Sequence, residues 1–168
     1  MTESELREAF ARARTLAGMG RDEEAEAAVE KILAADPRHL GALLLSAWMA
    51  SEDRDWDESL AITRRAASLW PRSAEARNAL ARCLHAMGRD EEALAAAVEA
   101  RALLDVGDNA PQASAVYLTL VWCLRELRRY REAIAAAEEG LERAPDAVLA
   151  QWATQVQDEA IAAEKERC

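Results

Sequence analysis

A seven-residue segment occurs twice without change in this chain of 168 residues. The segment Met19–Ala25 reads Met-Gly-Arg-Asp-Glu-Glu-Ala, and it returns in full at Met87–Ala93, 68 positions later. A weaker copy lies halfway, at Arg54–Ser59, and Pro37 and Pro71 are also 34 positions apart. A fixed period of this length is typical of repeat proteins, in which each unit is stabilised by stacking on its neighbours.

A fourth copy follows at Arg129–Ala133, but the step that leads to it is 40 positions instead of 34. Six additional residues therefore lie between the third and fourth copies, most simply within Asp105–Pro111. We interpret this segment as a loop, with the alternative that it shapes one end of a binding groove.

The stretches between the turns are about 14–16 residues long, which is marginal for an isolated helix in water. The chain is rich in Ala, Leu, Glu and Arg and poor in Gly and Pro, which favours helix. The sequence therefore predicts helix pairs that stack on one another, at 3–18 with 22–35, 39–52 with 55–69, 73–87 with 89–104, and 112–127 with 130–143. A final helix at 146–165 would place Leu149, Trp152, Val156 and Ala160 on one face. Thr2 with Glu5, and Asp55 with Glu58, have capping-box spacing.

A unit that recurs every 34 positions, with a Gly turn, a small residue five positions later and a closing Pro, resembles the tetratricopeptide repeat. The resemblance implies an all-α fold, an α-solenoid of about four helix pairs plus a C-terminal capping helix. It implies a single domain over 1–168, with repeats at about 6–39, 40–73, 74–107 and 114–147 and the capping helix at 146–165. Four positions depart from the pattern: Arg54 at a turn, Ser59 for Ala, Arg77 for a large apolar residue, and Asp105 for the closing Pro.

The resemblance also implies that the first helices of successive pairs line a concave side. Two of them, around Leu40–Ala50 and Val116–Leu127, are apolar almost all round, so each is either wholly buried or keeps one face for another molecule. The repeat register predicts a partner-binding groove formed by Phe10, Arg14, Leu44, Trp48, Asn78, Arg82, His85, Leu118, Trp122 and Arg125. The alternative for the equivalent residues Trp48 and Trp122 is packing between adjacent helices.

These features predict a protein–protein interaction scaffold or adaptor that binds a peptide or protein segment in the groove, with a chaperone-like role as one form of this function. The alternative is a self-assembling, homo-oligomeric subunit of a larger complex. The arginines and Asn78 of the groove would suit an acidic segment or a C-terminal carboxylate, whereas arginines on a solvated face are the simpler explanation.

The formal net charge of −10 and the pI near 4.8 argue against nucleic acid and anionic membranes as partners. No apolar run approaches the roughly 20 residues that span a bilayer. The N-terminal residues 1–14 lack the apolar segment of a signal peptide, so we expect a cytoplasmic protein.

The sequence contains no pattern that indicates catalysis, a cofactor or a metal. Two histidines and the three cysteines Cys83, Cys123 and Cys168 have no metal-ligand spacing, so we expect neither a metal site nor an enzyme. A third hypothesis, an enzyme with an isolated thiol, would require a depressed pKa at Cys83 or Cys123. Cys168, near the chain end, would be the thiol most accessible to reagents.

Overall fold

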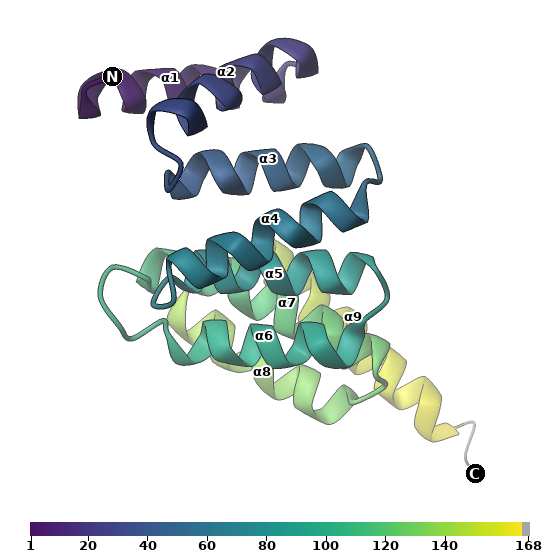
Figure 1. Ribbon diagram of the computed structural model, residues 1–168. Helices are drawn as coiled ribbons and strands as arrows, with labels where there is room; N and C mark the ends of the chain where they lie inside the picture. The colour runs from purple at the N-terminus through teal and green to yellow at the C-terminus, as the bar shows by residue number, and fades with distance from the viewer. Residues whose placement is uncertain (166–168) are drawn as a thin grey trace. The chain divides into compact units, whose positions relative to one another are not determined.

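The computed structural model describes residues 1–165, in which every regular element is a helix (Figure 1). The α-helices of this part of the chain are α1 (Glu3–Gly18), α2 (Asp22–Ala35), α3 (Leu40–Glu52), α4 (Trp56–Leu69), α5 (Ala74–Ala86), α6 (Asp90–Ala102), α7 (Ala113–Glu126), α8 (Tyr130–Arg143) and α9 (Ala147–Lys165). A short 3₁₀ helix, η1 (Ala110–Gln112), precedes α7. The predicted fold class, four helix pairs of the tetratricopeptide type followed by a C-terminal helix, is confirmed.

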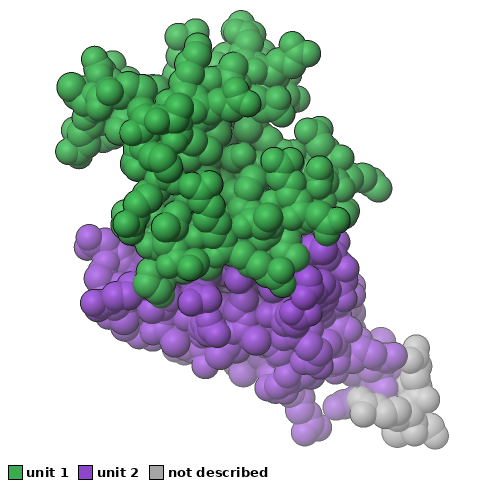
Figure 2. Space-filling view, viewed as in Figure 1, with its two compact units in different colours: residues 1–71 green, residues 72–168 purple. Residues whose placement is uncertain are grey.

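The helices form two compact units, residues 1–71 and residues 72–168 (Figure 2). In unit 1, α1 packs against α2, α2 against α3, and α3 against α4. In unit 2, each of the helices α5 to α9 packs against the next, and α7 also contacts α5 and α9. Each unit thus repeats one arrangement, a helix pair stacked on a neighbouring helix. The extent of a single domain over 1–168 stays a prediction.

Small residues lie wherever two helices of a pair approach closely. The alanines at these positions are buried, namely Ala13, Ala25 and Ala47 in unit 1 and Ala81, Ala93 and Ala133 in unit 2. Ser59 takes the place of alanine in α4, and its hydroxyl donates a hydrogen bond of 2.9 Å to the carbonyl oxygen of Ala47 in α3. A buried hydroxyl with such a partner carries no unsatisfied polar atom, so the departure from alanine leaves the packing intact.

Each helix pair is joined by a turn that contains a residue with positive φ. The four residues follow the repeat register, and their φ values are 70° at Gly20, 62° at Arg54, 71° at Gly88 and 57° at Arg128. Glycine adopts this left-handed conformation freely, whereas a side chain places Cβ close to the backbone at a cost of about 1–2 kcal/mol. The second and fourth turns therefore keep the backbone geometry of the other two against the preference of arginine.

We expect Arg54→Gly and Arg128→Gly each to raise the free energy of unfolding by about 0.5–1 kcal/mol. The gain is the relief of left-handed strain minus the larger entropy of glycine in the unfolded chain. Urea denaturation followed by circular dichroism measures it. Arg64→Gly, in the interior of α4, is the control and should lower stability by about 1 kcal/mol. A loss of stability in the two turn variants would contradict the prediction.

The predicted helix caps at two helix starts are present. The Thr2 backbone N–H donates to the Glu5 carboxylate at 2.7 Å, and the Glu5 N–H donates to the Thr2 hydroxyl at 3.3 Å, which completes a capping box. At α4, the Glu58 N–H donates to the Asp55 carboxylate at 3.1 Å. These bonds satisfy backbone donors that the first turn of a helix leaves without intrahelical partners.

The segment with the additional residues is held by the side chain of Asn109. Its amide nitrogen donates to the carbonyl oxygens of Arg72, Leu103 and Val106 at 2.9, 3.1 and 2.6 Å. Its amide oxygen accepts a bond of 3.0 Å from the backbone N–H of Ala74, at the start of α5. We call this set of bonds the Asn109 clasp. The insertion is thus a loop, as interpreted, and it is fastened to the start of its own repeat.

Two further departures from the repeat pattern have partners in unit 2. Asp105, in place of the closing proline, accepts hydrogen bonds of 2.9 and 3.1 Å from Arg143, and these bonds hold the pKa of its carboxyl below the usual value. Arg77, at a position that usually holds a large apolar residue, is half-buried and pairs with Glu99 of α6 at 3.2 Å. Each of these two departures is therefore a charged side chain that pairs with an oppositely charged residue of a helix in unit 2.

Candidate functional site

The predicted groove residues of unit 1 come from α1 and α3. The Phe10 ring packs beside α3, where it lies 5.1 Å from the ring of His39 between centroids and meets the backbone at Gly41. The Arg14 guanidinium lies 6.0 Å from the centre of the Phe10 ring, on the exposed side. Trp48 is 39% exposed, an unusual degree for so large an apolar side chain. Phe10 and Arg14 are therefore in contact, while Trp48 presents its ring to solvent.

The predicted residues of unit 2 contribute to a cluster of stacked rings on α5, α7 and α9. His85 stacks on Trp122 with centroids 6.3 Å apart and an interplanar angle of 19°. Trp122 in turn meets Trp152 edge to face, with centroids 6.1 Å apart. The Arg125 guanidinium lies 5.6 Å from the centre of the Trp152 ring. Trp122 thus packs between neighbouring helices, the alternative considered for it, whereas its equivalent Trp48 is exposed.

The charged groups near these residues differ in how far they are neutralised. Arg125 donates to Glu159 of α9 at 2.8 and 3.0 Å, and its hydrogen bonds lower the pKa of that carboxyl. His85 Nδ1 lies 2.7 Å from Asp90. Arg14 and Arg82 are exposed and form no ion pair with any residue in the described part of the chain. Only these two of the predicted cations are therefore free to meet an acidic ligand.

Two buried side-chain atoms lack a hydrogen-bond partner among residues 1–165, and both belong to predicted groove residues. They are Oδ1 of Asn78 in α5 and Nε1 of Trp122 in α7. Asn78 is only 5% exposed. Because a buried polar atom without a partner costs about 1–3 kcal/mol, such atoms call for a specific explanation. One is an acceptor and the other a donor, and neither atom is accessible to solvent.

Sequence reasoning missed the contribution of α9 to the ring cluster. Trp152 was expected on the packing face of a capping helix, and it does contact α7, but it also forms part of the cluster with Trp122. Trp152 follows Leu118 by 34 positions, so it holds the next place in the same repeat register. Extending the register by one unit into α9 would have added it to the predicted residues. Leu118 itself is half-buried on α7.

The structure offers little for catalysis in the part of the chain that it describes. Within residues 1–165, no group of three or more His, Cys, Asp and Glu side chains is placed to hold a metal ion. Cys83 and Cys123 are buried, and burial raises the pKa of the Cys123 thiol to about 12. A catalytic thiol requires the opposite shift, so Cys123 lacks the property that the thiol-enzyme hypothesis demands. Cys168 lies outside the described residues. No helix among those described has the length and apolar character to cross a membrane.

The helix pairs and their register define a helical-repeat protein, and comparison with known proteins agrees. Residues 72–146 match the family model of the tetratricopeptide repeat, and residues 19–100 match that of subunit 3 of the anaphase-promoting complex, or cyclosome. The chain therefore contains tetratricopeptide repeats, which the family model matches over residues 72–146. None of the curated proteins compared with the sequence matches it.

Solved structures share the fold at low sequence identity. PilW, a widely conserved type IV pilus biogenesis factor, has a TM-score of 0.82 and 22% identity over 95% of this chain and 71% of its own. PilF of Pseudomonas aeruginosa has a TM-score of 0.80 and 19% identity over 93% of this chain and 69% of its own. The tetratricopeptide-repeat protein TTC0263 of Thermus thermophilus has a TM-score of 0.77 and 17% identity over 94% of this chain and 87% of its own. These likenesses show the fold alone.

Proposed function

We propose that the chain is a non-catalytic adaptor that binds a peptide or protein segment on its first helices. Two surfaces are in question: the predicted residues of α1 and α3 form one in unit 1, and those of α5 and α7 form the other in unit 2. We call each of them the first-helix face of its unit, and the two together the first-helix face. The membership of the chain in the tetratricopeptide family, a class of protein-interaction scaffolds, supports a protein partner. The observation that carries the proposal is the exposure of Trp48, a large apolar side chain of this face that is 39% exposed.

The chemistry of the face indicates what kind of segment would bind. Exposed aromatic side chains and arginines are the residues that most often dominate binding energy at protein interfaces, and Trp48 is such a side chain. The unpaired Arg14 and Arg82 favour an acidic segment. A chaperone-like hold on an extended client is one form of this binding.

We expect Asn78→Leu to weaken peptide binding about tenfold or more without lowering the stability of the protein. Leucine is the residue at the equivalent positions 44 and 118, and it removes the buried acceptor that has no partner. Peptides selected from a display library on the immobilised wild-type protein would be titrated by calorimetry, with urea denaturation run in parallel. Equal binding by Asn78→Leu and wild type would contradict the role of Asn78.

The same titrations separate the first-helix face from the rest of unit 1. Trp48→Ala should weaken the selected peptides, and the control Trp70→Ala should not, because Trp70 is similarly exposed at 41% but follows the second helix α4. If both tryptophan variants bind as the wild type does, or if both lose the peptide equally, the first-helix face is not the binding surface.

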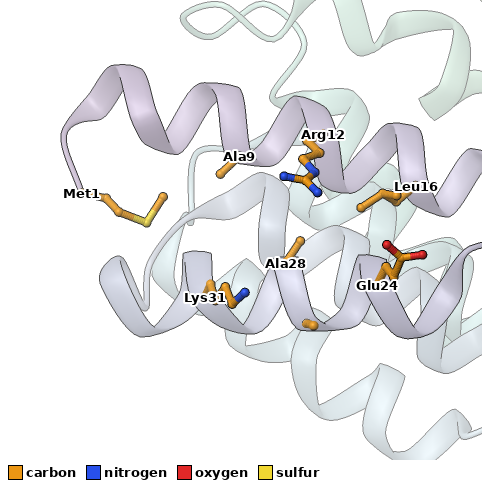
Figure 3. Close-up of a pocket in the computed structure, with 8 residues that line it drawn as sticks. Met1, Ala9, Arg12, Leu16, Glu24, Ala28 and Lys31 are labelled. Carbon is orange, nitrogen blue, oxygen red and sulfur yellow. The ribbon is translucent and has the colours of Figure 1, made fainter.

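The alternative function, a self-assembling subunit, is favoured by different surfaces. Large apolar side chains outside the first-helix face are exposed on α9, where Val148 is 51% and Ile161 is 53% exposed. The first helix pair also has an open side that holds a pocket (Figure 3). These two surfaces do not contribute to the proposed peptide site.

A further inference from the structure

Helix α1 of the first repeat corresponds in register to α3 of the second repeat. Leu43 and Ala50 of α3 are buried in unit 1, where α3 packs against α2 of the preceding repeat. Their register equivalents in α1 are Ala9 and Leu16, 34 positions earlier. Between these two residues lies Arg12, which is exposed. Leu16 is buried within unit 1, whereas Arg12 and the half-buried Ala9 line a pocket.

This pocket lies between α1 and α2, is open to solvent and has a volume of about 340 Å³ (Figure 3). Alanines of both helices line it, and small side chains allow another helix to approach closely; the lining residues include Ala9, Ala27 and Ala28. Arg12 and Lys31 also line the pocket, and neither forms an ion pair within residues 1–165. Glu24 lines the pocket as well, but it pairs with Arg21 at 2.6 Å. In a chain of net charge −10, the two unpaired cations around the alanine floor therefore form a local basic surface.

Helix α9 carries a surface with the complementary character. It begins 34 positions after the start of α7 and so holds the place of a first helix, and its residues Leu149, Ala153 and Val156 pack into unit 2. Away from that packing, Asp158, Ile161 and Glu164 are exposed at intervals of three residues, about one helical turn each. Ile161 is therefore an exposed apolar side chain with an acidic residue on either side.

We propose that copies of this chain associate head to tail, with α9 of one copy seated in the α1–α2 pocket of a second copy. Ile161 would lie on the alanine floor, and Asp158 and Glu164 would meet Arg12 and Lys31. Glu164 already contacts Arg131 at 3.7 Å, but both side chains are largely exposed, so exchanging that partner costs little. The occupant is a second copy because the acidic and apolar pattern that fits the pocket is present on this chain itself.

The two contacting surfaces differ, so the contact is heterologous. Each copy of a dimer keeps one unused pocket or one unused α9, so further copies can add. The surface on a single helix is smaller than a standard protein interface, which places the dissociation constant at about 10–100 µM. This inference is independent of the proposed peptide site, because none of its residues lies on the first-helix face.

Sedimentation velocity of the full chain from about 5 to 500 µM tests the proposal, a range chosen to bracket that dissociation constant. The wild type should show a mass average that rises with concentration and falls when salt is raised, because salt screens exposed charges. A pocket variant, Arg12→Glu with Lys31→Glu, and an α9 variant, Asp158→Lys with Ile161→Lys, should each weaken self-association by about tenfold or more.

Mixing the two variants gives the decisive result. The pocket variant retains a normal α9 and the α9 variant retains a normal pocket, so an equimolar mixture should form 1:1 dimers and nothing larger. Arg64→Glu with Arg72→Glu is the control for the change of charge, and Val98→Lys, 44% exposed on α6, is the control for the apolar residue. Both controls should associate as the wild type does.

Three results would overturn the proposal: a wild type that stays monomeric up to the highest concentration, a mixture that remains monomeric, or controls that lose association as the variants do. Circular dichroism checks that all variants are folded. Titration of the selected peptides into the pocket and α9 variants should give wild-type affinity, which separates a failure of this proposal from a failure of the peptide site.

Discussion

Leu149→Ala is expected to lower the free energy of unfolding by about 3 kcal/mol, the middle of the range for truncating a fully buried leucine. Leu149 is 0% exposed in α9, where it packs beside α8, so its loss leaves a cavity between the two helices. Urea denaturation followed by circular dichroism measures the loss. Val148→Ala is the matched control, because the neighbouring side chain is 51% exposed and should change stability by less than about 0.5 kcal/mol. Equal effects of the two variants would show that α9 is not held by this contact.

Gly140→Ala should lower the free energy of unfolding by about 2 kcal/mol, although alanine favours helix over glycine by about 1 kcal/mol. A Cβ at Gly140 would lie 2.7 Å from Cβ and Cγ of Tyr117 and from Cδ2 of Leu149. Tyr117 is fully buried, and the atoms near its own backbone cannot rotate away. Overpacking of about 3 kcal/mol therefore outweighs the gain in helix propensity.

Gly41→Ala is the control for this variant, with the same substitution in another helix. A Cβ there would meet the far end of the Phe10 ring, which is half-buried and can shift by rotation of the side chain, unlike the Tyr117 atoms beside Gly140. Stability should then change by less than about 0.5 kcal/mol. Because Gly140 and Leu149 share a contact, the double variant Gly140→Ala, Leu149→Ala should cost less than the sum of its parts. Additive losses, or a larger loss at Gly41, would contradict the packing described for α8.

The predicted helix bounds agree with the structure to within two residues, because the signals for these bounds are local. Gly20 and Gly88 mark turns, and Pro37 and Pro71 mark helix ends, at positions that follow the repeat period. The bounds of the remaining helices were predicted by placing the same turns and helices at the intervals that the repeat gives. The left-handed conformation of Arg128 was not predicted, since the longer step before the fourth repeat obscures its equivalence to Gly20.

Interactions between side chains were harder to predict than the helices. Trp48 and Trp122 have the same place in the repeat, yet one is exposed and the other lies between two rings. The difference arises from His85 and Trp152, whose contacts depend on the rotamers and packing of three helices. A pattern of spacing contains no such information, so it indicates a face but not the environment of each residue on it. The ten predicted partner-binding residues stay a proposal.

The Asn109 clasp has a consequence for local opening of the chain. Backbone N–H groups in the first turn of a helix usually exchange with solvent deuterium quickly, because they lack intrahelical partners. The N–H of Ala74, at the start of α5, is bound to a side chain 35 residues away. Its exchange rate therefore reports when the loop before α7 releases, and a single amide becomes a sensor of the connection between the third and fourth repeats.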